Sequence, residues 1–291
     1  MQTKEKAYAK INLFLDVVGR RDDGFHNIKT VMHTISLYDD IEVEATESAV
    51  SSFSLDIIHS PAPLSSTDNL ILVAAKRYAE YAGISAHVDI KLKKRIPIAA
   101  GLAGGSSDAA AVLRAMNRIF EQRLSKEELL RVAEEIGSDV PYCLMGGTAL
   151  CEGRGEIMTK LSDPLPMHFV IAVSDEQVST PRAYAALDAM YSNFDGSVAS
   201  PSEKALDELL AFLDGSCLPK SLYNIFESAV LPTYKGAYLI KQLIIRNHAS
   251  LALMSGSGPS VFGIFKNRDD AKHCAESLSA GGIRAYYAVS V

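Results

Sequence analysis

The stretch PIAAGLAGGSSDAAAVLRAMN, residues 97–117, joins a glycine-rich turn to an alanine-rich segment. Gly101, Gly104 and Gly105 fall within five positions, and two serines follow them directly. Glycines let backbone N–H groups approach an anion closely, and a helix that begins there presents its positive end to the same point. The pattern therefore predicts either a phosphate-binding turn or a tight turn of small residues that serves close packing.

One residue argues against phosphate at this turn. Asp108 follows the two serines, and a carboxylate repels a phosphate group. Its side chain can nevertheless point away while the backbone N–H groups face the anion. The turn has neither the G-x-x-x-x-G-K-[ST] pattern of a P-loop nor the glycine spacing of a dinucleotide fold, and it lacks a G-x-S-x-G nucleophile elbow. On the residues alone, both alternatives stay open.

The segments around the turn predict a strand before it and a helix after it. HVDIKLKKRIP, residues 87–97, alternates apolar and polar residues, which is typical of a strand with one buried face. After the turn, apolar residues recur at helical spacing. These residues are Ala109, Val112, Leu113, Met116 and Phe120. Residues 7–17 also alternate and predict another half-buried strand.

Cap residues predict where three further helices begin. We expect one helix to be capped by Thr67 or Asp68. A second follows Ser125, which has a glutamate three positions later and so forms a capping box. A third is capped by Thr180, with Pro181 in the first helical position.

Strands and helices are mixed without strict alternation, so we expect an α+β fold in two domains. The segment LSDPLP, residues 161–166, carries two prolines and is the best candidate for the boundary. The sequence therefore predicts an N-terminal domain over residues 1–162 and a C-terminal domain over residues 163–291.

Composition limits the classes of function. The chain has 291 residues and a formal net charge of −6, so it has no general attraction for nucleic acid or anionic membranes. Its four cysteines form no C-x-x-C pair, which argues against zinc and disulfides and suits a reducing cytoplasm. No apolar run approaches the roughly 18 residues of a membrane-spanning helix.

Three other features have both a structural and a functional interpretation. Lys10, within an apolar strand, is either a solvated or sheet-edge residue or an ammonium directed at phosphate or a reacting hydroxyl. Asp139 in GSDVP is either a turn former or a general base. SGSGPS, residues 255–260, is either a hairpin turn or a second backbone cradle beside the first.

Together, three segments resemble the three motifs of the GHMP small-molecule kinases. The first motif is AKINLFLDVVGRRDDGFHNIKTVM (residues 9–32), the second is the stretch at 97–117, and the third is MSGSGPSVFGIF (residues 254–265). The first motif and GSDVP narrow the resemblance to the branch that acts on 4-diphosphocytidyl-2-C-methyl-D-erythritol. That branch implies a ribosomal-S5-like N-terminal domain and a ferredoxin-like C-terminal domain. It also implies phosphorylation of the 2-hydroxyl by ATP, normally with Mg²⁺, in the non-mevalonate isoprenoid route.

The resemblance implies two catalytic residues and an ATP-binding segment. Lys10 matches the lysine of the first motif, and Asp139 matches the catalytic aspartate. Asp139 would accept the proton of the attacking hydroxyl, while Lys10 keeps Asp139 ionised and stabilises the attacking oxygen. We call residues 97–107 the glycine loop. Its matched ATP-binding residues are Pro97, Ile98, Ala99, Ala100, Gly101, Leu102, Ala103, Gly104, Gly105, Ser106 and Ser107.

The resemblance also implies how the cytidyl group binds. Phe25 and His26 match the D-G-[YF]-H pattern, and Asn12 matches a polar position near the substrate. Tyr184, in STPRAY, matches the aromatic residue that stacks on cytosine. Two aromatic faces and an imidazole suit a nucleobase, which a kinase for homoserine, mevalonate or another small alcohol does not need to recognise.

Some features depart from the family pattern or stay open. Alanines stand at positions 99, 100 and 103, where the family loop is richer in glycine, and we expect these positions only to need small residues. The metal ligands are not assigned. A non-catalytic sensor with this fold should have lost Lys10 or Asp139, and an RNA-binding module should carry a basic stripe. Both monomer and homodimer are compatible with the sequence.

Overall fold

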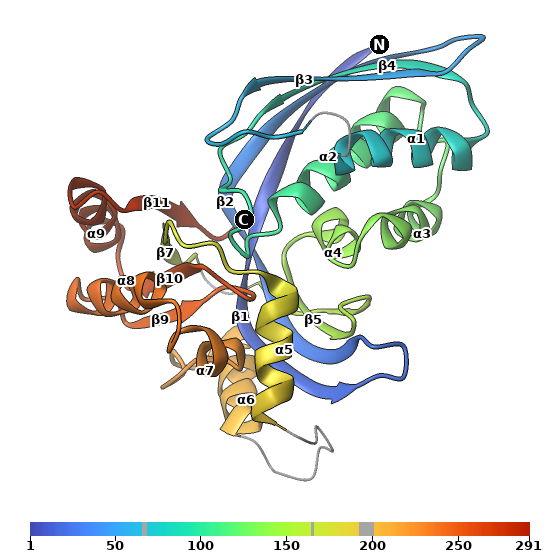
Figure 1. Cartoon of the computed structure of the whole chain (residues 1–291). Helices are drawn as coiled ribbons and strands as arrows, with labels where there is room; N and C mark the ends of the chain where they lie inside the picture. Colours follow the sequence, from blue (N-terminus) through green and yellow to red (C-terminus); the bar gives the residue numbers. More distant parts are fainter. Residues whose placement is uncertain (66–68, 164–165, 192–200) are drawn as a thin grey trace. The chain divides into compact units, whose positions relative to one another are not determined.

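The computed structural model describes residues 1–65, 69–163, 166–191 and 201–291 (Figure 1). The chain packs as two compact units, and neither is one continuous segment, because strands β1 (Gln2–Arg20) and β2 (His26–Glu47) contribute residues to both. The first unit comprises Met1–Ala9, Leu37–Ile98 and Ala103–Gly146, and the second comprises Lys10–Ser36, Ala99–Leu102 and Gly147–Val291. The single boundary at residue 163 stays a prediction.

In the first unit, helices pack on one face of a mixed sheet. The sheet order is β3 (Ser52–His59), β4 (Ala86–Lys93), β2, β1, with β3 parallel and β2 antiparallel to β4. Helices α1 and α2 lie along the sheet (Figure 1). The helices of this unit are α1 (Leu70–Ala82), α2 (Gly104–Ile119), α3 (Lys126–Ile136) and α4 (Val140–Met145).

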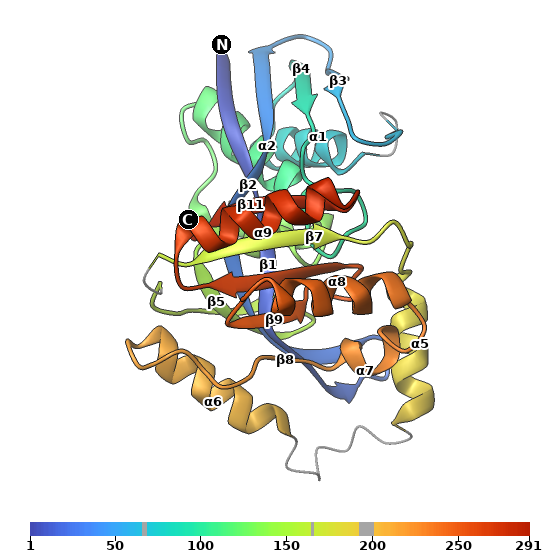
Figure 2. The ribbon, with the colours of Figure 1, turned by 90° about the vertical axis from the view of Figure 1, so that its left-hand side faces the viewer.

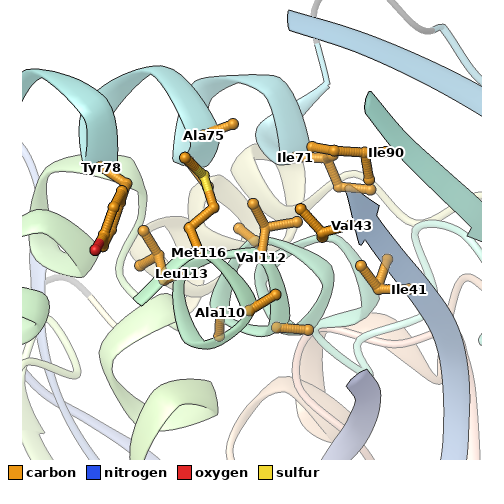
Figure 3. Packing of buried hydrophobic residues seen from close by; sticks show 14 of the residues in the cluster. Ile41, Val43, Ile71, Ala75, Tyr78, Ile90, Ala110, Val112, Leu113 and Met116 are labelled. Carbon is orange, nitrogen blue, oxygen red and sulfur yellow. The ribbon is translucent and has the colours of Figure 1, made fainter. Parts of the chain in front are cut away.

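The core of the first unit follows from the apolar periodicity. Every second residue of β4 is buried, starting at Ala86, which confirms the strand predicted over this segment. Val43 and Ile90 from the sheet pack against Ile71 of α1 and Val112 of α2 (Figure 3). The alanines of α2 are fully buried, and their small side chains let the two helices approach closely.

The second unit contains a four-stranded antiparallel sheet with the order β11 (Arg284–Val289), β7 (His168–Val173), β10 (Ser260–Phe265), β9 (Leu251–Met254). Helices α8 (Lys235–Arg246) and α9 (Arg268–Ala280) cover one face of it (Figure 2). Its remaining elements are β5 (Thr148–Gly153), β6 (Ile157–Lys160), β8 (Tyr223–Asn224), α5 (Thr180–Met190), α6 (Pro201–Leu213) and α7 (Phe226–Val230).

The mixed architecture confirms the α+β class, whereas two of the three predicted caps are wrong. Helix α1 is capped by Asn69, whose side chain accepts a hydrogen bond from the Ile71 N–H; positions 67 and 68 lie outside the described residues. Ser179 occupies the N-cap position of α5 without a side-chain capping hydrogen bond, so Thr180 is the first residue of the helix. The capping box at Ser125 is confirmed. Within the described ranges, no helix has both the length and the apolar character to cross a bilayer.

Candidate active site

The glycine loop has a strained backbone. Ala99 has a φ of 52°, Gly101 of 75° and Ala103 of 53°, all in the left-handed region. An alanine in that region costs roughly 1–2 kcal/mol, because its Cβ crowds the following carbonyl. The expectation that these alanine positions only need to be small is therefore wrong for Ala99 and Ala103. It holds for Ala100, which is not among the residues with a positive φ.

The second half of the glycine loop is the first turn of α2. Ala103 occupies the N-cap position and offers no side-chain acceptor, so the first N–H groups of the helix are left for another acceptor. An anion is favoured at such a helix end. Gly105 is exposed and Ser106 is half-buried there. Ser107 is buried, and its hydroxyl donates to the Tyr8 carbonyl oxygen at 2.5 Å.

Asp108 does not present its carboxylate to solvent at this helix end. Its side chain is buried, and the ammonium of Lys94 donates to its Oδ2 at 2.6 Å. Burial raises the pKa of Asp108 well above its ordinary range. The repulsion between Asp108 and phosphate is correspondingly weaker, because the side chain is turned inward and its ionised form is disfavoured.

The first, second and third motifs meet within the second unit. The Ser255 hydroxyl donates to the Gly101 carbonyl oxygen at 3.0 Å, and the Ser260 hydroxyl donates to the Ala100 carbonyl oxygen. From the first motif, the backbone N–H of Lys10 donates to the Leu102 carbonyl oxygen at 3.2 Å. SGSGPS is thus more than an isolated turn, because it lies directly against the glycine loop.

Lys10 is buried rather than solvated, with only 4% of the residue exposed. A buried ammonium must be paired or hydrogen-bonded to be tolerated. Its Nζ donates to Oδ1 of Asn12 at 2.8 Å, and Nδ2 of Asn12 donates to the Thr30 hydroxyl at 2.8 Å. The interpretation of Lys10 as a surface residue is therefore wrong, and the structure joins it to Asn12, another predicted site residue.

Asp139 is half-buried at the N-cap position of α4. Its carbonyl oxygen accepts the hydrogen bond from the Cys143 N–H at 3.0 Å, but its side chain makes no capping hydrogen bond. The carboxylate is therefore not used to cap α4. Asp139 belongs to the first unit and Lys10 to the second, and their joint action remains a prediction.

The predicted cytidyl-binding residues fall into two groups. His26 stacks on Tyr184, with ring centroids 4.7 Å apart and an interplanar angle of 21°. The ring of Phe226 packs edge-on against the ring of Tyr184, with the two centroids 4.9 Å apart. The Phe25 ring is instead exposed and lies under the guanidinium of Arg154, 4.1 Å from its centroid.

The sequence interpretation missed the partner of His26. Nε2 of His26 lies 2.7 Å from Oδ1 of Asp188, so this carboxylate orients the imidazole. Asp188 follows Tyr184 by four residues on α5, which places both on one helix face. That spacing was available in the sequence, but it becomes informative only once the pairing of α5 with His26 is known.

The described ranges contain no group of three or more His, Cys, Asp or Glu side chains suited to hold a metal ion.

Comparisons with known proteins match nearly the whole chain. The model of the GHMP kinases N-terminal domain matches residues 69–147, and that of the GHMP kinases C-terminal domain matches residues 203–284. The 4-diphosphocytidyl-2-C-methyl-D-erythritol kinase of Caldicellulosiruptor saccharolyticus is 43% identical over 280 residues, covering 94% of this chain and 91% of that protein. The enzyme of that name from Clostridioides difficile is 41% identical over 270 residues, covering 91% and 88%.

Comparison with solved structures leads to the same family as these relatives. A crystal structure of 4-(cytidine 5'-diphospho)-2C-methyl-D-erythritol kinase is similar with a TM-score of 0.81 and 32% identity, covering 99% of this chain and all of that one. A homoserine kinase from Cytophaga hutchinsonii has a TM-score of 0.74 at 21% identity, covering 100% of this chain and 94% of that one. The similarity to the homoserine kinase concerns the fold alone.

Proposed function

The chain belongs to the 4-diphosphocytidyl-2-C-methyl-D-erythritol kinases of the GHMP kinase superfamily, and we propose that it transfers the γ-phosphoryl group of ATP to the 2-hydroxyl of this alcohol. The observation that carries the proposal is the meeting of the three motifs: Asn12, Gly101 and Ser255 are linked by backbone and hydroxyl hydrogen bonds. Separate packing roles for these motifs would not require them to converge.

In this proposal the glycine loop binds the phosphates of ATP. The N–H groups at the start of α2 and the positive end of the helix favour an anion at this position. The hydrogen bonds from Ser255 and Ser260 to loop carbonyl oxygens fix the loop backbone, so that its amides need little rearrangement when phosphate arrives. Mg²⁺ would neutralise charge on the phosphates.

Lys10 and Asp139 would act on the reacting hydroxyl. Asp139 accepts its proton, and the Lys10 ammonium stabilises charge on the attacking oxygen. The hydrogen bond from Nζ of Lys10 to Asn12 orients this ammonium, and Thr30 in turn orients Asn12. A carboxylate is a weak base for an alcohol, so positioning and charge stabilisation supply most of the rate, as is usual in phosphoryl transfer.

The cytidyl group would bind beside His26 and Tyr184. Asp188 orients the His26 ring for a hydrogen bond to the base edge, and Tyr184 and Phe25 offer aromatic faces. Because His26 already stacks on Tyr184, the incoming base must use the opposite face of Tyr184, displace His26, or stack on Phe25. A kinase for a small alcohol has no use for this arrangement.

The test compares acceptors. Purified protein is given ATP and Mg²⁺ with the cytidyl alcohol, homoserine or mevalonate, and ADP release is measured with a coupled assay. We expect the cytidyl alcohol to be phosphorylated with the highest kcat/KM. Faster turnover of homoserine or mevalonate would overturn the proposed substrate, and ³¹P NMR of the product identifies the hydroxyl that received phosphate.

We further propose that the enzyme works in the cytoplasm on small molecules, with neither nucleic acid nor membrane as a partner. The formal charge of −6 and four cysteines that form no disulfide within the described ranges support this proposal. Light scattering after size-exclusion chromatography distinguishes a monomer from a homodimer.

A further inference from the structure

A buried cluster of three charged residues lies in the first unit. The ammonium of Lys94 donates to Oδ2 of Asp39 and to Oδ2 of Asp108, both at 2.6 Å. The exposed side-chain fractions are 3% for Lys94, 0% for Asp39 and 2% for Asp108. Charged side chains are almost never buried this completely unless they are paired, so this fold keeps the cluster at a cost in desolvation.

The cluster joins three segments that are far apart in the sequence. Asp39 is part of β2, Lys94 follows β4, and Asp108 belongs to the first half of α2. Well-packed apolar residues often replace a buried ion pair with no loss of stability. Stability alone is therefore a poor reason for this arrangement, and its position in the fold needs another explanation.

The cluster contacts both ends of the glycine loop. Oδ1 of Asp39 accepts hydrogen bonds from the backbone N–H groups of Arg95 and Ile96, which lead directly into the loop. On the other side, a Cβ atom added to Gly104 would lie 2.9 Å from Nζ of Lys94. The same ammonium thus contacts the first turn of α2, where the loop ends.

We propose that Asp39, Lys94 and Asp108 are positioning residues for ATP, which hold the entrance of the glycine loop and the first turn of α2 at a set spacing. The inference rests on the proposed function of the glycine loop as the phosphate-binding segment. The cluster itself does not contact the nucleotide in this proposal. It acts by preorganising the loop amides, which lowers the entropy lost when phosphate binds.

The protonation of the cluster is consistent with this role. Burial raises the pKa of Asp108, Lys94 opposes this rise, and Asp39 adds to it. Burial alone would lower the pKa of Lys94, but the two carboxylates outweigh it and raise the pKa. Oδ1 of Asp108 has no hydrogen-bond partner within the described part of the chain. The Lys94 ammonium bonds both carboxyl groups, so the cluster holds the loop while the ammonium offsets their negative charge.

The first test is Lys94→Met, which keeps most of the side-chain volume and removes the charge. The ammonium that joins Asp39 to Asp108 is then lost, which releases both ends of the loop. We expect the KM for ATP to rise at least tenfold, while kcat and the KM for the cytidyl alcohol change less than threefold. Calorimetry with a non-hydrolysable ATP analogue should show the same weakening. An ATP KM within twofold of wild type in the folded variant overturns the proposal.

A matched control separates positioning from stability. Arg114 also lies on α2, beyond the end of the glycine loop, where it donates to Glu5 at 3.2 Å and to the Cys143 carbonyl oxygen at 3.0 Å. Arg114→Met should lower the Tm and leave the KM for ATP within twofold. If it raises the ATP KM as much as Lys94→Met does at an equal loss of Tm, the cluster is merely structural and the proposal fails.

If Lys94→Met does not fold, Asp39→Asn is the second test variant. It is a milder change, because Lys94 and Asp108 remain paired. The amide places a donor against the ammonium, so we expect at least a threefold rise in the ATP KM with kcat unchanged. An unchanged ATP KM in this folded variant contradicts the proposal. If wild-type protein fails to phosphorylate the cytidyl alcohol, the proposed function fails instead, and analogue binding still tests the cluster.

Discussion

The Ser255 hydroxyl donates to the Gly101 carbonyl oxygen at 3.0 Å, across 154 residues of sequence. A Cβ atom added to Gly101 would lie 2.2 Å from the Ser255 carbonyl oxygen, far inside van der Waals contact. Both partners at this point are backbone, so no side-chain rotation can relieve the overlap. The glycine loop and the third motif are therefore in contact through a position that only glycine can occupy.

We predict from this contact that Gly101→Ala separates the two loops. The free energy of unfolding should fall by at least about 2 kcal/mol, of which left-handed strain accounts for about 1 kcal/mol. Urea denaturation measures the change. Gly282→Ala is the matched control, because Gly282 has a similar φ of 82° with no atom within 4 Å of the added Cβ. Equal losses in the two variants would show that the contact with Ser255 adds nothing.

Glycine in place of either strained alanine, Ala99 or Ala103, should stabilise the protein rather than destabilise it. Ala99→Gly and Ala103→Gly should each stabilise the protein by about 0.5 kcal/mol, because relief of left-handed strain exceeds the entropy that glycine adds to the unfolded chain. Ala100→Gly, where φ is not positive, should destabilise it by a similar amount. Thermal unfolding resolves the sign, and the same sign in all three variants would argue against the loop geometry.

His33 predicts a loss of stability in mild acid. Burial lowers its pKa to about 4, so below pH 6.5 the unfolded chain binds the proton and the folded protein does not. From pH 7 to pH 5 the free energy of unfolding should fall by about 2 kcal/mol on account of this residue. His33→Asn should flatten that part of the profile, whereas a substitution of the exposed His273 should not. A profile that keeps its slope in His33→Asn contradicts the assignment.

The contact between Asp188 and His26 predicts that loss of Asp188 weakens binding of the cytidyl alcohol but not of ATP. Asp188→Ala removes the acceptor 2.7 Å from Nε2 of His26, so the imidazole loses its orientation. We expect the KM for the cytidyl alcohol to rise about tenfold, a loss of about 1.4 kcal/mol, with the ATP KM unchanged. The exposed Asp175, paired with Arg284 at the surface, supplies the control Asp175→Ala. A larger rise in the KM for ATP than in the KM for the cytidyl alcohol would contradict a role of Asp188 in binding the cytidyl group.

The catalytic assignment predicts a defect in kcat. Asp139→Asn keeps the shape of the side chain and removes the proton acceptor, so kcat should fall at least about 100-fold. The KM values should change far less, because the amide still fills the same space. Asp56→Asn, an exposed carboxylate in the same unit, is the control. Unchanged phosphorylation by Asp139→Asn would remove this residue from the mechanism.

Part of the site was accessible to sequence reasoning because it depends on local chemistry. The glycine spacing predicted a turn followed by a helix, and α2 begins at Gly104. The capping box at Ser125 needs only residues three positions apart, so it was also predictable. The left-handed φ of Ala99 and Ala103 was not, because alanine on its own avoids that region and only the surrounding contacts impose it.

By itself, the sequence determined the α+β class, the family and the residues available for chemistry, since these follow from periodicity and from short motifs. Tertiary structure decided the environment of those residues. Lys10 became a buried group held by Asn12, and Asp108 turned inward to Lys94. Burial and pairing bring together segments that are distant in the chain, and no local pattern records which charges will share a low-dielectric interior.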